Sequence, residues 1–254
     1  MPSSTLYAFL LSFLAGISTL IGALIIFLDK RKNNKIVTIS LSFAAGVMIC
    51  VSLTDLLPNS FNMILNSTNF FPKLILTLIF MVIGIIISML IDKYLPSEYE
   101  NKDNKGLYKI GIISMVAIVL HNIPEGIATF ITSSNNITLG ITLSLAIALH
   151  NIPEGISIAV PIYHSTNNKL KAIMYAFISG MSEVIGSVLA YLFLAPFINE
   201  HIMAALYAII AGIMIHISVY ELIPGAYKES TLKGVLKYFI IGMMVMIISH
   251  MLMM

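Results

Sequence analysis

The chain has 254 residues, of which 58% are hydrophobic and only 10% are charged, with a formal net charge of +2. Because a soluble domain carries about 25% charged residues, this composition excludes an ordinary soluble protein and indicates an integral membrane protein. The small net charge gives no sign of nucleic-acid binding, and the single cysteine, Cys50, excludes a disulfide framework within one chain. The lipid bilayer is therefore the first partner that the sequence predicts.

Eight hydrophobic segments, each long enough to cross a bilayer, follow one another along the chain. A transmembrane helix needs roughly 20 apolar residues. The predicted spans are residues 6–28, 36–57, 71–92, 108–133, 137–163, 170–194, 202–224 and 234–252. No polar stretch between them is long enough for a soluble domain, so we expect residues 1–254 to form one all-α, multi-pass transmembrane domain.

The basic residues predict how these helices are oriented. Of the 14 lysines and arginines, all but Lys73 lie in or beside the loops that follow spans one, three, five and seven. Cytoplasmic loops carry an excess of such residues. We therefore expect a plasma-membrane protein with both termini outside the cytosol.

The outer side of the predicted bundle carries three polar residues of interest. Span two ends in the string Thr-Asp-Leu-Leu-Pro at residues 54–58, which places Asp55 near the outer mouth. Asp55 is a candidate for the way into the membrane, and the simpler alternative is a residue that caps or anchors the helix end. His201 and His250 lie at predicted outer ends and are most simply interfacial residues.

The hexapeptide His-Asn-Ile-Pro-Glu-Gly occurs twice, at residues 121–126 in span four and at residues 150–155 in span five. A histidine and a glutamate at positions i and i+4 share one face of a helix, so each copy places an imidazole beside a carboxylate. Ionisable residues inside a membrane are costly and mark binding sites or ion routes. Because the two spans are antiparallel and joined by the short turn 133–136, the motifs are expected to meet at one depth.

Mixed imidazole and carboxylate ligands suit zinc, iron(II), manganese, cobalt or nickel. One ion would be held by His121, Glu125, His150 and Glu154. An adjacent second ion, bridged by the two motif glutamates, would add Asn122, Asn151 and Glu183, the last of these in span six. The proline of each motif also removes a hydrogen bond from the preceding turn, which offers a backbone carbonyl as a further ligand.

The simpler interpretations of these residues are structural. A single intramembrane histidine more often bonds a neighbouring helix than a metal, and a single proline is usually a kink. Two copies of the whole string favour a metal or proton role instead. The 16 methionines are better explained by packing than by soft-metal binding.

Span seven ends in Tyr-Glu-Leu-Ile-Pro at residues 220–224, which echoes the end of span two. The two spans run in opposite directions, so the echo favours an inverted repeat in which spans one to three mirror spans six to eight. The candidates for an inner exit route are His164, His216 and Glu221.

These residues resemble the ZIP family of zinc- and iron-regulated metal transporters, most closely its bacterial ZupT-type members. The resemblance rests on the two hexapeptides, on Ser-Gly-Met-Ser-Glu at residues 179–183, and on the acids and prolines that end spans two and seven. It implies eight helices in a three-plus-two-plus-three arrangement and a two-metal centre between spans four, five and six. By this match Glu125 and Glu154 are the bridging carboxylates, and Glu183 is the acid of the second site.

The resemblance also implies a function. The expected activity is import of Zn²⁺, and also of Fe²⁺ and other divalent ions such as Mn²⁺ and Co²⁺, as bound substrates without a prosthetic group. A homodimer is one candidate assembly. Two alternatives stay open at this point. An intramembrane zinc metalloenzyme would use a metal-bound water, although the His-Glu-x-x-His string of that class is missing here. A metal efflux carrier would use the same ligands, because ligands do not define direction.

Overall fold

The computed structural model describes residues 3–27, 34–64, 69–94, 105–194, 197 and 199–253, and all regular structure within these ranges is helical. The helices are α1 (Ser3–Ala23), η1 (Leu24–Phe27), α2 (Asn34–Val51), η2 (Ser52–Leu56), α3 (Leu57–Met63), α4 (Phe70–Tyr94), α5 (Lys105–Asn135), α6 (Ile137–Thr166), α7 (Lys169–Leu189), η3 (Ala190–Leu194), α8 (Glu200–Ile217), η4 (Ser218–Leu222), α9 (Ile223–Lys228) and α10 (Leu232–Met253).

The eight predicted spans are confirmed, since the described residues contain eight helices long and apolar enough to cross a membrane. Two of them extend well beyond their predicted C-terminal ends. The second span runs over Asn34–Met63 and the seventh over Glu200–Lys228. We expected both to end at their prolines, Pro58 and Pro224.

Two π-helical turns explain why these spans continue past proline. The turns η2 and η4 occupy equivalent places in the second and seventh spans, immediately before short α-helices that carry proline in their first turn. A first-turn proline lacks only an N–H that has no partner inside that helix. Such π turns often mark functional positions, and here they hold Asp55 and Glu221.

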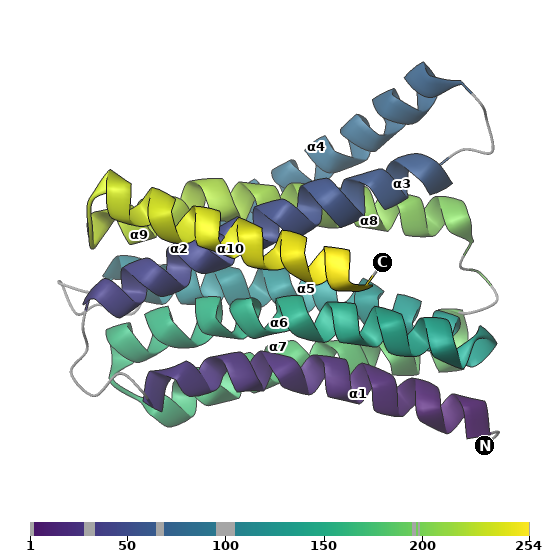
Figure 1. Ribbon diagram of the computed structural model, residues 1–254, viewed down its shortest axis with the longest axis horizontal. Coiled ribbons are helices and arrows are strands. Elements are labelled where there is room, and N and C mark those ends of the chain that lie inside the picture. Colours follow the sequence, from purple (N-terminus) through teal and green to yellow (C-terminus); the bar gives the residue numbers. More distant parts are fainter. Residues whose placement is uncertain are drawn as a thin grey trace.

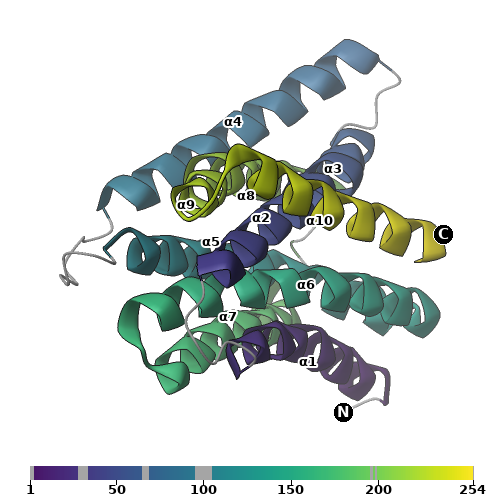
Figure 2. The same ribbon diagram turned by 60° about the vertical axis from the view of Figure 1, so that its left-hand side comes forward.

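The helices form two sets that pack side by side (Figures 1 and 2). The motif helices are α1, α5, α6 and α7, each of which contacts the other three. The flanking helices are α2 with α3, α4, α8 with α9, and α10, with α4 against α8 and α10 against α2. The two sets meet mainly where α2 contacts α6 and where α5 contacts α8.

Glycines allow the motif helices to approach one another until their backbones are in contact. A methyl group on Gly22 of α1 would collide with the carbonyl oxygen of Ile152, and one on Gly186 of α7 would collide with that of Ile123. Ile152 and Ile123 are the equivalent third residues of the two hexapeptides. Small residues that permit such close approach are typical of membrane helix packing. The first and sixth spans therefore clamp the two motifs by matching contacts.

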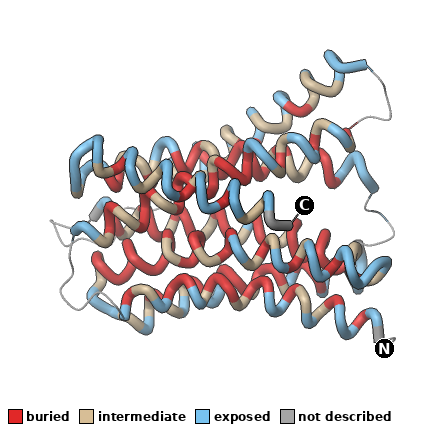
Figure 3. The backbone as a smooth tube through the Cα atoms, viewed as in Figure 1, coloured by how far each residue is buried: buried red, intermediate tan, exposed pale blue. Residues whose placement is uncertain are grey.

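The flanking helices show the same kind of matching. Gly242 of α10 lies against the carbonyl oxygen of Phe43 on α2, and Gly84 of α4 lies against that of Ile209 on α8. Both helices of the outer pair, α4 and α10, are exposed along most of their length (Figure 3). In a bilayer these faces are covered by lipid, which accounts for their continuous apolar surface.

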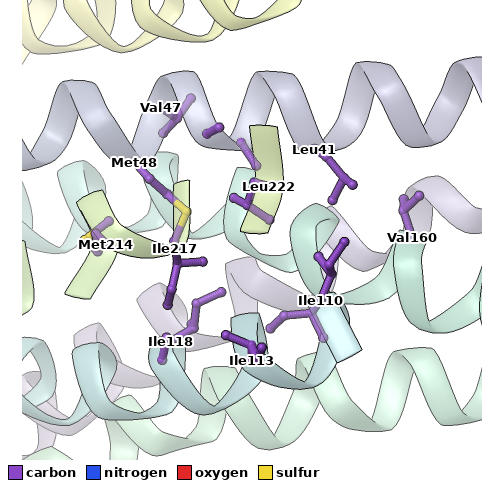
Figure 4. Packing of buried hydrophobic residues seen from close by; sticks show 14 of the residues in the cluster. Leu41, Val47, Met48, Ile110, Ile113, Ile118, Val160, Met214, Ile217 and Leu222 are labelled. Atoms are coloured by element: carbon purple, nitrogen blue, oxygen red, sulfur yellow. The ribbon is translucent and has the colours of Figure 1, made fainter. Parts of the chain in front are cut away.

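The two ends of the bundle differ in how the sets pack together. Helix α1 begins and α10 ends at one end, which we call the terminal end; α2 and α5 begin at the opposite, far end (Figure 1). Close to the far end, apolar side chains of α2, α5, α6, α8 and η4 interlock, as Figure 4 shows for Leu41, Ile110 and Leu222. This cluster fills the space between the motif helices and the flanking helices there.

Candidate metal centre

The two hexapeptides lie on neighbouring helices that remain continuous through their prolines. Helix α5 carries the first motif with Pro124, and α6 carries the second with Pro153. Asn136, between them, caps α6 by accepting hydrogen bonds from the backbone N–H groups of Thr138 and Leu139. The seven candidate ligands are all buried: His121, Asn122, Glu125, His150, Asn151, Glu154 and Glu183.

Two imidazoles and two carboxylates come together between α5 and α6. His121 Nε2 lies 3.2 Å from Glu125 Oε1 and 3.4 Å from Glu154 Oε1, and His150 Nε2 lies 3.1 Å from Glu125 Oε1. Ligand atoms of one tetrahedral ion with bonds of about 2.0–2.1 Å lie about 3.3 Å apart. Ligand atoms of His121, Glu125 and His150 also all lie within 4.8 Å of one another, so these residues can hold one ion.

The two asparagines are fixed by their amide nitrogens. Asn122 Nδ2 donates to the carbonyl oxygen of Ser179 on α7 over 3.1 Å. Asn151 Nδ2 donates to the carbonyl oxygen of Ala15 on α1 and to Glu183 Oε2, each over 3.0 Å. Glu183 in turn interacts electrostatically with the motif glutamates. The second predicted group of ligands therefore adjoins the first. Backbone carbonyl groups of α1 and α7 hold its asparagine side chains in place.

Several buried oxygens at this position have no hydrogen-bond partner. They are Oδ1 of Asn122, Oδ1 of Asn151, Oε2 of Glu125, both carboxylate oxygens of Glu154 and Oε1 of Glu183. An unpaired buried acceptor costs about 1–3 kcal/mol, and more when it carries charge. A cation bound here would supply a partner for oxygens of this kind.

One polar residue at the edge of this group was not found from the sequence. Thr19 of α1 is fully buried, and its hydroxyl has no hydrogen-bond partner. The signal was present as a weak echo, because residues 16–22 read GISTLIG and residues 180–186 read GMSEVIG. This alignment places Thr19 at the position of Glu183, and the glycines that flank both residues make matching contacts.

A cavity of about 100 Å³ leads from the two motifs toward the terminal end. It lies between the motif helices and the flanking helices. At one end it is lined by Glu125 and His150, and at the other by Asp55 and His250, with Tyr207 of α8 also in its wall. His250 Nδ1 is 3.2 Å from Asp55 Oδ1, so this histidine has a specific partner besides the interface we expected for it.

The remaining candidate residues lie away from the motifs. His201 Nδ1 is 3.0 Å from the carbonyl oxygen of Ile64. Toward the far end, His216 Nδ1 is 2.9 Å from Ser88 Oγ, and His164 is buried near the end of α6.

Glu221 belongs to a group of charges at the far end. It interacts with Asp92 of α4, whose Oδ1 atom is 2.6 Å from Lys109 Nζ of α5. The acid at the end of span seven is thus placed beside a second acid and a lysine, an arrangement that the sequence did not indicate.

The sequence is similar to those of known zinc transporters along nearly its whole length. The family described as ZIP zinc transporter matches residues 2–109 and 95–250. A zinc transporter ZupT of Streptococcus mutans is 38% identical, covering 95% of this chain and 96% of its own length. Those of Clostridium perfringens (38% identical; 97% of this chain, 96% of its own length) and Campylobacter jejuni (39%; 95% and 94%) are similar.

These relatives are named as transporters and not as enzymes. The match includes both motif helices and both π turns, and it extends over nearly the whole molecule. The chain is therefore a multi-pass membrane protein that belongs to the ZIP family of zinc transporters.

Proposed function

We propose that this protein imports Zn²⁺, and also Fe²⁺ and other divalent ions such as Mn²⁺ and Co²⁺, across the plasma membrane into the cytosol. The observation that carries the proposal is the meeting of two imidazoles and three buried carboxylates, and each carboxylate has at least one oxygen without a hydrogen-bond partner. Zinc comes from the family and from the names of the relatives. The wider range of metals follows from the ligands, because nitrogen and oxygen donors accept all of these ions.

The site holds two ions in this proposal. One is bound by both histidines and both motif glutamates, and the other by the two asparagines and Glu183, with Glu125 and Glu154 bridging them. Two observations support the second ion. Hydrogen bonds fix the asparagine nitrogens while both asparagine oxygens lack partners. Three neighbouring carboxylates also carry more charge than one divalent ion offsets.

The route and its direction follow from an inverted repeat with both termini outside the cytosol. Support comes from glycine contacts that match in pairs: those made by α1 match those made by α7, and the contact of α4 with α8 matches the contact of α10 with α2. The π turns η2 and η4 are also equivalent in position. Ions then enter past Asp55 at the terminal end and leave past Glu221 at the far end; His216 and His164 are further candidates along the exit. An inward-negative potential contributes about 2.3 kcal/mol per charge per 100 mV, and roughly twice that for a divalent ion.

The decisive experiment is ⁶⁵Zn²⁺ uptake into vesicles that contain the purified protein. Glu125→Ala and Glu154→Ala are each expected to reduce uptake at least a hundredfold, because each removes a ligand shared by both ions. Leu145→Ala, an exposed residue on the same helix as Glu154, serves as the control and should keep wild-type uptake. Wild-type rates in both glutamate variants would contradict a metal route through this site.

Direction and range of metals need separate measurements. Expression in cells should raise cytosolic zinc, whereas an efflux carrier would lower it. Unlabelled Fe²⁺, Mn²⁺ and Co²⁺ should each compete with ⁶⁵Zn²⁺, while Ca²⁺, which favours sites made only of oxygen, should compete poorly.

A further inference from the structure

The terminal end of the cavity contains a second group of side chains of the types that bind metals. Asp55 belongs to η2 and His250 to the last turns of α10, and both are about 30% exposed, at 27% and 31% respectively. Their nearest atoms, Oδ1 and Nδ1, are 3.2 Å apart. Asn59, one turn beyond Asp55, lines the same cavity and offers an amide oxygen. Asp55 and His250 thus approach each other from two spans of the flanking set, and Asn59 lines the same cavity from the span that carries Asp55.

The spacing of this group fits an ion as well as it fits a hydrogen bond. Two ligand atoms on one zinc ion, with bonds of about 2.0–2.1 Å and tetrahedral angles, lie about 3.3 Å apart. The separation of Oδ1 and Nδ1 is close to this value and to the separations between ligands in the central site. The carboxylate and imidazole therefore need no large movement to bind an ion between them.

The cavity gives this group a direct connection to the central site. The same continuous space is lined by Asp55 and His250 at the mouth and by Glu125 and His150 inside. The space between these two pairs is lined mainly by apolar side chains such as Val51, Leu143 and Met246. Between the two pairs, the described residues that line this cavity include no acidic side chain that could bind a partly dehydrated ion.

We propose that Asp55 and His250, with Asn59, form an outer metal-binding site, separate from the central one, which selects zinc-like ions before they enter the cavity. The imidazole is the selective element. Borderline ions such as Zn²⁺ accept nitrogen ligands readily, whereas Ca²⁺ and Mg²⁺ prefer oxygen alone. The role in uptake rests on the proposed function, but binding at this site does not.

The first test measures binding without transport. In detergent, Glu125→Ala removes the shared ligand of the central site, and titration calorimetry with Zn²⁺ should detect one remaining site. Adding His250→Ala should abolish that binding, while adding His201→Ala should leave it unchanged. Zinc binding of unchanged stoichiometry and affinity when His250→Ala is added to Glu125→Ala would overturn the proposal.

The second test separates a ligand from a hydrogen-bond partner. His250→Gln keeps a donor for Asp55 but loses the imidazole, and His250→Cys supplies a zinc ligand that bonds Asp55 poorly. Both are made with Cys50→Ser, so the cysteine variant has a single thiol at residue 250 and the glutamine variant has none. A metal ligand predicts that the cysteine variant retains zinc affinity and gains Cd²⁺ affinity, and that the glutamine variant loses at least tenfold. The reverse order would assign His250 a structural role only.

Uptake completes the design. His250→Gln should raise the KM for Zn²⁺ about fivefold or more while the maximal rate changes little, because the central site is intact. An unchanged KM in a protein that transports zinc normally would overturn the proposal while leaving the proposed function in place. If the wild type does not transport zinc, the proposed function is wrong. The calorimetric measurement would then still show whether the outer site binds zinc.

Discussion

The seam between the motif helices and the flanking helices is hollow at the terminal end and filled at the far end. At the terminal end a cavity with a polar mouth lies between the two sets, lined by residues of α5 and α6 on one side and of η2, α8 and α10 on the other. At the far end the same two sets are joined by interlocked side chains such as Ile110 and Leu222 (Figure 4), and Lys109 of α5 pairs with Asp92 of α4 over 2.6 Å. One seam thus has two kinds of contact.

This difference indicates a conformation that is open toward the terminal end and closed toward the far end. Glu125 and His150 line the cavity that runs toward the terminal end, while apolar packing and the Lys109–Asp92 ion pair close the far end. A transporter must expose one site to both sides in turn, which here requires the far-end contacts to separate while the cavity closes. Variants that change one end, or the motif helices themselves, while the other end stays intact can test this comparison.

Among changes to the two ends of the seam, the largest effect is expected from blocking the cavity. Ala146 lines its wall on α6 and is small, so Ala146→Phe should fill the space between the mouth and the central site. Zinc uptake should fall at least tenfold, without loss of zinc binding from detergent solution after long equilibration.

The neighbouring Leu145→Phe provides a matched control, because residue 145 is 58% exposed on the outer face of the same helix. It adds a similar ring at almost the same depth but outside the cavity. Equal loss of uptake in the two variants would show that the cavity is not the route.

The next effect concerns the motif helices as a unit. A methyl group on Gly155 would collide with the backbone carbonyl of Thr19, so Gly155→Ala should push α6 away from α1. Forced overpacking of this kind costs about 1–3 kcal/mol. We expect a lower melting temperature in detergent together with weaker zinc binding.

Gly106→Ala is the control for this glycine, since the nearest atom to its added methyl is the flexible Lys228 Nζ at 3.8 Å. It should leave both the melting temperature and zinc binding unchanged. If Gly155→Ala were equally harmless, the two motifs would not depend on backbone contact with α1.

The smallest effect is expected at the far end. A partly exposed ion pair contributes about 0.2–1 kcal/mol, so Lys109→Ala should shift the balance between conformations by about two- to fivefold toward opening there. Labelling of a cysteine at Leu143, which lines the cavity, reports this balance when Cys50 is replaced by serine. The label added from the terminal side should react more slowly in Lys109→Ala.

Lys237→Ala removes an exposed lysine of α10 near the same end, where its ammonium lies over the ring of Tyr238 within one helix. It should not change the labelling rate. A similar change in both variants would assign the effect to surface charge and not to the contact between the two sets.

The sequence predicted the parts of this molecule that depend on local pattern. Hydropathy located eight spans, and two copies of one hexapeptide indicated the residues that meet at the centre. It did not predict that the second and seventh spans continue past Pro58 and Pro224, because a π turn is set by the packing of its neighbours and not by a local signal. The pairing of His250 with Asp55 joins residues far apart in the chain, which no spacing rule reaches.

Thr19 bears on the balance of charge that the proposed centre would have. In the aligned segments 16–22 and 180–186, α7 carries a carboxylate, Glu183, where α1 carries only a hydroxyl. If the centre holds two divalent ions, as proposed, and Glu125, Glu154 and Glu183 are ionised, the formal sum is about one positive charge. The two ions would then repel each other without full compensation, so the arrival of one would favour the departure of the other. A fourth carboxylate at residue 19 would balance the pair and would favour its retention.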